Sequence, residues 1–133
     1  MKKSVLLNSG ISRVISQMGH FDTLTIGDAG LPVPDGVERI DLAVKLGIPP
    51  FLDTLDAVMS ELCVQKMTIA KEASEKNKKL FDFFVSYCKK NKIQLAQVSH
   101  EEFKVLTKNS KAIVRTGECK PYANVILESG VTF

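Results

Sequence analysis

The stretch GHFDTLTIGDAGLPVP, from Gly19 to Pro34, joins a histidine, a strand-like run and an aspartate. The run DTLTIGD contains enough alternating β-branched and apolar residues to favour a short strand over 22–28. The glycines and prolines of AGLPVPDG then indicate a turn that ends the strand. The stretch poses one question: either His20 and Asp28 are a catalytic acid and its binding partner, or they are a helix end and a turn residue.

A helix is expected directly before this strand. The segment from Ser9 to Met18 carries apolar residues at helical spacing, with Ser9 as the candidate N-cap and Gly19 where helices often stop. His20 would then lie near the negative end of the helix dipole, which favours a protonated imidazole and suits a proton donor.

The rest of the chain alternates between helix-like and strand-like segments. Four segments are expected to be helical or to turn: RIDLAVKLGIPPF (39–51), VQKMTIAKEASEKNKK (64–79), LFDFFVSYCKKNK (80–92) and SHEEFKVL (99–106), where Ser99 and Glu102 have capping-box spacing. Four are expected to be strands, at least at their start: FLDTLDAVMSEL (51–62), IQLAQVS (93–99), AIVRTGE (112–118) and NVILESGVTF (124–133). This alternation predicts an α/β domain with a layered sheet.

Length and composition limit the class of protein. The 133 residues suit one domain over 1–133, and 44% hydrophobic with 25% charged residues is typical of an ordinary globular chain. A net charge of +3 is too small to indicate a nucleic-acid partner, and no apolar run approaches the roughly 18 residues that cross a bilayer. Three widely spaced cysteines without a CxxC pair argue against disulfides and a zinc site. We expect a cytoplasmic location.

Four residues outside the opening helix could bind a polar ligand, and each has a plain structural alternative. Asp28 at a strand's carboxyl end could bind sugar hydroxyls, or could form a turn of its own. Tyr122 and Asn124, two apart, would face one side of an extended backbone as a ring and an amide, or could belong to a turn and an edge strand. His100 opens a helix, where the dipole favours the neutral ring, yet it could equally be a surface residue.

Three long segments, in order, resemble one known family. NSGISRVISQMGHFDTLTIGDAGLPVP (8–34), RIDLAVKLGIPPFLDTL (39–55) and RTGECKPYANVILESGVTF (115–133) are similar to the D-ribose pyranase family, the mutarotases of ribose and fucose. The resemblance covers essentially the whole chain. It implies a single three-layer α/β/α domain with a central sheet.

The same resemblance implies an activity and a site. The family exchanges the pyranose and furanose forms of β-D-ribose, supplying the furanose that ribokinase phosphorylates, with no cofactor and no metal. Its proton donor corresponds to His20. Its sugar contacts correspond to Asp28, His100, Tyr122, Ala123 and Asn124. The family assembles as a homodecamer of stacked pentameric rings with each sugar site at a subunit boundary, and no nucleic acid or membrane partner is expected.

Three hypotheses follow from these observations. The first is an isomerase that acts on free D-ribose, with His20 protonating the ring oxygen during ring opening. The second is a sugar-binding module that uses the same surface without turnover. The third is an oligomeric structural protein in which the histidines only terminate helices.

Overall fold

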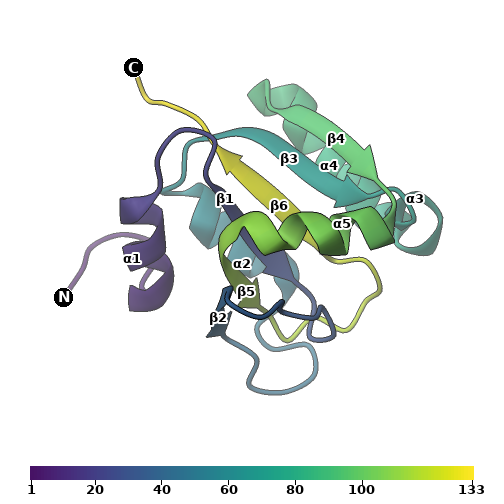
Figure 1. Cartoon of the computed structure of the whole chain (residues 1–133), viewed down its shortest axis with the longest axis horizontal. Coiled ribbons are helices and arrows are strands. Elements are labelled where there is room, and N and C mark those ends of the chain that lie inside the picture. Colours follow the sequence, from purple (N-terminus) through teal and green to yellow (C-terminus); the bar gives the residue numbers. More distant parts are fainter.

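One six-stranded sheet organises the chain. The computed structural model describes residues 1–133, and the strands lie in the order β2-β5-β1-β6-β3-β4 (Figure 1). Their bounds are β1 Thr23–Gly27, β2 Glu38–Asp41, β3 Val64–Ala70, β4 Gln94–Val98, β5 Ser110–Arg115 and β6 Val125–Ser129. β1 pairs with β5 in parallel, β5 with β2 in parallel, and β3 with β4 in parallel, whereas β6 runs antiparallel to both β1 and β3. The carboxyl ends of the five parallel strands therefore lie beside the start of β6. This end of the sheet is called the edge below.

Helices cover both faces of this sheet. They are α1 Ser9–Gln17, α2 Phe51–Met59, α3 Ala73–Lys76, α4 Lys78–Asn91 and α5 His100–Leu106, followed by a 3-10 turn at Thr107–Asn109. Figure 1 shows α5 in front of the sheet, with α2 and α4 behind it. The three-layer α/β/α arrangement expected from the sequence is thus confirmed. No helix has both the length and the apolar character needed to cross a membrane.

Strand alternation divides the core between the two layers. On β6, Val125 and Leu127 join the large cluster under α2 and α4, while Ile126 between them joins a small cluster with Phe103 of α5. The same alternation places Ile113 of β5 in the small cluster, because successive side chains of a strand point to opposite faces. The large cluster holds 20 buried residues and the small one 4, so α5 is fixed by a narrow apolar contact.

Three predicted elements are wrong in type. The segment 51–62 begins as α2 rather than a strand, because Phe51, Leu55 and Val58 lie at helical spacing and are all buried on one face. The segment 64–79 begins as β3 rather than a helix, with Met67 and Ile69 on the same face of the sheet. Within 39–51, β2 replaces the expected helix or turn and pairs along β5.

The predictions for helix ends are partly confirmed. α1 starts at Ser9 as expected, but the cap is Asn8, whose side-chain oxygen accepts a hydrogen bond from the Ile11 amide. At α5 the Ser99 hydroxyl accepts from the Glu102 amide at 3.1 Å, which confirms Ser99 as the cap. A β-hydroxyl or amide oxygen at this position satisfies an amide that the helix leaves unpaired. The first turn of α5, which carries His100, is therefore well fixed.

Gly117, just after β5, joins the sheet edge to the loop that precedes α2. Its carbonyl oxygen accepts from the Gly47 amide at 2.6 Å, and its amide donates to the Pro49 carbonyl at 2.9 Å. A Cβ atom added at Gly117 would fall on the backbone of Ile48, which cannot rotate away as a flexible side chain would. Only glycine permits this close approach of two backbones.

We expect Gly117→Ala to lower the free energy of unfolding by about 1–3 kcal/mol, because the added methyl group must push the two loops apart. Urea unfolding followed by circular dichroism would measure the change. Gly19→Ala is the matched control, since its Cβ would meet only the Asp22 carboxylate oxygen at 3.8 Å. Equal stability of the two variants would contradict the close approach.

Candidate active site

Polar residues gather where the five parallel strands end and β6 begins. Asp28 follows β1, Glu72 follows β3, His100 follows β4, and the segment from Tyr122 to Asn124 precedes β6. Ligands of open α/β sheets bind beyond the carboxyl ends of the strands. The topology therefore brings chemically active side chains, up to 96 residues apart in sequence, to one edge.

Asp28 and Asn124 form a reciprocal pair at this edge. The Asn124 Nδ2 donates to Asp28 Oδ2 at 3.0 Å, and the Asp28 amide donates to Asn124 Oδ1 at 2.8 Å. The other carboxylate oxygen, Oδ1, accepts from the Gly30 amide at 3.0 Å. The turn expected at Asp28 is thus present, and the same carboxylate lies where β1 ends, among the candidate site residues.

Burial changes the acidity of this carboxyl group. Loss of solvent around the half-buried side chain raises the pKa of Asp28 above its ordinary value, and hydrogen bonds from Gly30 and Asn124 oppose the rise without cancelling it. A positive charge on the nearby His100 ring would also oppose the rise. The Asp28 carboxyl group is therefore a weaker acid than a solvent-exposed aspartate.

The pair depends on the glycine that ends β1. A Cβ atom at Gly27 would lie 2.5 Å from Leu31 Cδ2 and 3.1 Å from Asn124 Oδ1. The Gly27 carbonyl also accepts a hydrogen bond from the Thr116 hydroxyl at 2.8 Å. A side chain at residue 27 would therefore crowd both Leu31 and the Asn124 amide, and glycine avoids this crowding.

His100 is held by its backbone and leaves one ring nitrogen free. Its amide donates to both carboxylate oxygens of Glu72, at 3.0 and 3.1 Å. The ring packs edge-on against Tyr122, with centroids 5.1 Å apart, and lies parallel to Phe103 at 6.3 Å. The Nδ1 atom is buried and has no hydrogen-bond partner. Because buried polar atoms are nearly always paired, this nitrogen is available to a ligand.

Tyr122 reaches the site by a different backbone route from the one expected. Its φ is +56°, so the backbone is left-handed there rather than extended, and strand alternation does not relate Tyr122 to Asn124. The turn offered as the alternative is present, but the strand after it, β6, lies inside the sheet and not at its edge. The Asn77 side chain fixes this turn by donating to the Pro121 carbonyl at 2.9 Å. Ala123, 1% exposed, packs into the large core cluster between the two polar residues.

Two acidic residues important for this edge were not predicted. Glu72 was placed inside an expected helix, and its position after β3 appears only once 64–70 is assigned as a strand. Glu118 accepts from the amides of Cys119 and Lys120, both at 3.1 Å, and so supports the turn before Tyr122. Both residues follow the carboxyl end of a parallel strand, and that position is the signal that could have identified them.

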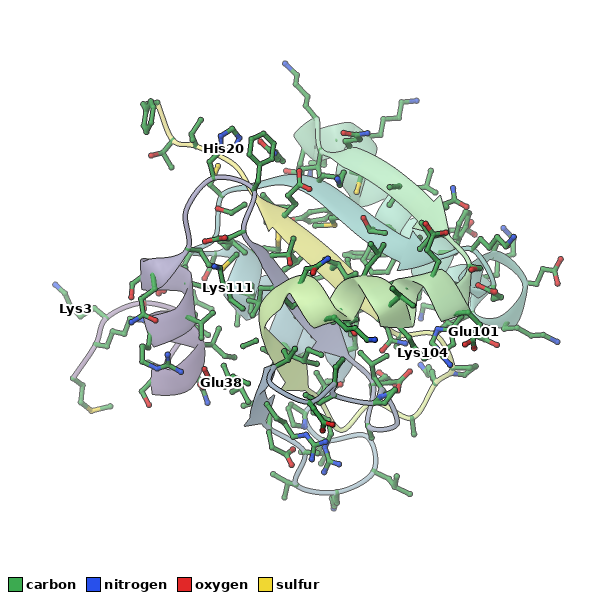
Figure 2. All side chains as sticks on the ribbon, viewed as in Figure 1. Lys3, His20, Glu38, Glu101, Lys104 and Lys111 are labelled. Atoms are coloured by element: carbon green, nitrogen blue, oxygen red, sulfur yellow. The ribbon has the colours of Figure 1, made fainter.

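His20 lies away from these residues within one chain. It precedes β1, whereas Asp28 follows it, and the strand alone spans about 13 Å at 3.3 Å per residue. Figure 2 shows His20 on the opposite side of the molecule from Glu101, the neighbour of His100. Its ring is exposed, lies 2.9 Å from Gln65 Oε1 and stacks on Phe21. The structure thus groups Asp28, His100, Tyr122, Ala123 and Asn124, and leaves His20 apart from them.

The sheet order and these polar side chains define a mixed α/β protein with a candidate ligand site where its parallel strands end. The chain belongs to the RbsD/FucU transport protein family, whose model matches residues 1–132. The family expected from the sequence is therefore confirmed.

Similar proteins agree over the full length. A D-ribose pyranase of Thermoanaerobacter sp. (strain X514) is 53% identical over 133 residues, and one of Haemophilus influenzae (strain 86-028NP) is 52% identical over 139 residues, with all of each chain covered. The structure of Bacillus subtilis RbsD complexed with D-ribose matches with a TM-score of 0.94 at 45% identity, covering 100% of both chains. A fucose mutarotase from Streptococcus pneumoniae, at 21% identity and a TM-score of 0.81, shares the fold.

We expect Asn124→Asp to lower the free energy of unfolding by roughly 2–4 kcal/mol at pH 7, because a buried carboxyl group would then adjoin the half-buried Asp28 carboxyl group. Folding raises the pKa of such a carboxyl, so the ionised form destabilises the fold and the loss shrinks as the pH falls from 7 towards about 4. Urea unfolding at several pH values would measure this. Exposed Asn109→Asp is the control, and a loss independent of pH would contradict the prediction.

Proposed function

We propose that this chain is a D-ribose pyranase, an isomerase that interconverts the β-pyranose and β-furanose forms of D-ribose. Relatives at about 53% identity over the whole length carry that name, and the B. subtilis relative was solved with D-ribose. The structural observation that carries the proposal is the buried, unpaired His100 Nδ1 beside the Asp28–Asn124 pair. Together these groups can accept and donate hydrogen bonds, and sugar hydroxyl groups need partners of both kinds.

The reaction consists of proton transfers around a ring opening. A proton is delivered to the ring oxygen, the bond from that oxygen to the anomeric carbon breaks, and the anomeric hydroxyl loses its proton to give the aldehyde. Closure through a different hydroxyl group gives the other ring form. Positioned acids and bases accelerate such steps by about 10²–10⁴-fold. No electron transfer occurs, so acid–base side chains are sufficient for the chemistry.

Each predicted site residue has a place in this scheme. Asp28 and Asn124 hold sugar hydroxyls, and Tyr122 supplies a ring face and a hydroxyl group next to Ala123. His100 Nδ1 orients the sugar or accepts its proton. His20 is the proton donor to the ring oxygen. The furanose that results is the form that ribokinase would phosphorylate in ribose catabolism.

His20 must come from a second copy of the chain. The donor and the sugar-holding group lie at opposite ends of β1, so one copy cannot apply both to one sugar. Opposite ends of a molecule meet in a head-to-tail contact, which closes into a ring when the rotation permits. This supports a closed ring with each sugar site at a subunit boundary, and the resemblance to the family implies that such rings are pentameric and stack into ten copies.

We also propose that the protein works in the cytoplasm. Cys63 and Cys119 are exposed and free, and Cys88 is buried and free. Exposed unpaired thiols are typical of a reducing compartment.

Saturation-transfer NMR on equilibrated D-ribose tests the activity. We expect the protein to accelerate exchange between pyranose and furanose signals, and His20→Ala to lower the catalysed rate by about 10²-fold or more because the proton donor is gone. Ribose binding, read from a rise in melting temperature, should persist in the variant.

The outcomes separate the three hypotheses. A ribose-dependent rise in melting temperature without accelerated exchange would indicate a binding module. No effect of ribose on either measurement would favour the structural protein. A wild-type rate in His20→Ala would remove His20 from the proposed mechanism.

A mixing experiment tests the composite site. His20→Ala and Asp28→Ala should each be inactive as pure assemblies, since every site lacks one group. Co-expressed in equal amounts, they should recover about one quarter of the wild-type rate, because that fraction of boundaries joins an intact His20 to an intact Asp28. No recovery in a mixed assembly verified by mass spectrometry would contradict the two-copy site.

A further inference from the structure

A short series of hydrogen bonds connects the His20 ring to strands β3 and β6. Its Nε2 lies 2.9 Å from Oε1 of Gln65 on β3. The Gln65 Nε2 donates to Oε1 of Glu128 on β6 at 2.8 Å, and the second Glu128 oxygen pairs with Lys66 Nζ at 2.7 Å. The site described above does not include Gln65, Glu128 or Lys66.

The carboxylate of Glu128 determines which group donates and which accepts in each of these hydrogen bonds. An ionised carboxylate only accepts hydrogen bonds, and the pKa of Glu128 is lowered: partial burial raises it, but the bonds from Lys66 and Gln65 outweigh burial. Gln65 must therefore turn its NH₂ group to Glu128 and its oxygen to His20. An amide oxygen also only accepts, so the proton between Gln65 and His20 belongs to His20 Nε2.

A second restraint acts on the plane of the His20 ring. Phe21 stacks on it with ring centroids 3.8 Å apart and planes 18° apart. Phe21 has a φ of +68°, which is unusual for a bulky residue, and its amide donates to the Ser129 carbonyl at 3.0 Å. Backbone strain of this kind persists only where the surroundings impose it, and it is concentrated at functional sites.

The other charges near this loop are already paired. Asp22 accepts from the Gly19 amide at 2.9 Å and forms an ion pair with Lys111 at 3.1 Å. Lys66 is paired with Glu128. Gln65 is thus the one polar side chain with a hydrogen bond to the imidazole, and Glu128 is the group that orients it.

From this geometry we propose that Gln65 and Glu128 are positioning residues for His20, which hold Nε2 as a donor and leave Nδ1 as the nitrogen that exchanges a proton with the sugar. The inference rests on the proposed function, in which His20 is the acid. It adds the ring nitrogen that acts and the residues that select it.

The proton balance follows directly. In the imidazolium form both ring nitrogens carry a proton, and the Nε2 proton remains in the bond to Gln65. The Nδ1 proton passes to the sugar ring oxygen, which keeps the electron pair of its broken bond to the anomeric carbon, while the anomeric hydroxyl gives its proton to His100 Nδ1 and becomes the aldehyde. His20 is left neutral with its proton on Nε2, the tautomer that Gln65 stabilises. Reclosure returns a proton to Nδ1.

A charge-exchange variant tests the inference most sharply. In Lys66→Glu/Glu128→Lys the ion pair is retained, but Gln65 now faces an ammonium group and must turn its oxygen towards it. The amide NH₂ then faces His20, which can bond only by accepting at Nε2, so the neutral ring should carry its proton on Nδ1. The ¹⁵N chemical shifts of the two ring nitrogens report this directly.

We expect that variant to lose about 10–100-fold in kcat with KM within about twofold, the range typical when a partner that orients a catalytic imidazole is lost. Gln65→Leu, which removes the hydrogen bond without adding charge, should lose kcat in the same range and show no protected Nε2 proton. Gln97→Leu on the edge strand β4, where the side chain is exposed, is the control and should retain the wild-type rate.

The results separate this inference from the function on which it rests. If the unaltered protein fails to accelerate ring exchange, the proposed function fails. If it is active but the charge-exchange variant keeps its proton on Nε2, or reverses the tautomer with kcat unchanged, the role of Gln65 and Glu128 is overturned. Full activity in Gln65→Leu would overturn it as well.

Discussion

The two hydrogen bonds between Asn124 and Asp28 are the constraint on which the functional edge depends. They join the start of the one antiparallel strand to the end of its neighbour, across 96 residues of sequence. Asn124 is 1% exposed, so its amide has no solvent to replace a lost partner. Gly27 leaves room for the Asn124 amide, and the Asp28 carboxylate also accepts from the Gly30 amide in the turn that follows β1. One buried pair thus sets the backbone of two segments that face a ligand.

A carboxylate that accepts a hydrogen bond from a side-chain amide occurs at both ends of the sheet. At one edge the Asp28 carboxylate orients the Asn124 amide, and at the other the Glu128 carboxylate orients the Gln65 amide. In each case a group that only accepts determines which way a two-sided amide points. The amide oxygen then faces a nitrogen that donates to it, the Asp28 backbone amide in one case and His20 Nε2 in the other. Carboxylates therefore organise this protein without having to react.

The candidate site residues Asp28, His100, Tyr122, Ala123 and Asn124 could be named from the sequence, but not Glu72, Glu118 or the contacts among them. Asp28 at a strand end and His100 at a capped helix start follow from local pattern, because caps and strand ends depend on nearby residues. The segments 51–62 and 64–79 were assigned the wrong element, since a short apolar run fits the period of a helix as well as that of a strand. Only packing in the folded protein selects one of the two. The links from Asp28 to Asn124 and from Gln65 to Glu128 join distant strands, so they depend on sheet order, which spacing along the chain does not encode. The resemblance to a known family supplied the roles that the local pattern left open.

The antiparallel β6 is the last strand in chain order, yet it lies in the middle of the sheet between β1 and β3. The parallel pair β3-β4 can form from nearby parts of the chain, but β1 and β2 have no strand between them until β5 is available, and nothing joins the two halves of the sheet until residues 125–129 insert. Until then β1 and β3 present bare inner edges, which invite pairing with other chains. Completion of this sheet is therefore a late, long-range event in folding, and the incomplete sheet is open to aggregation.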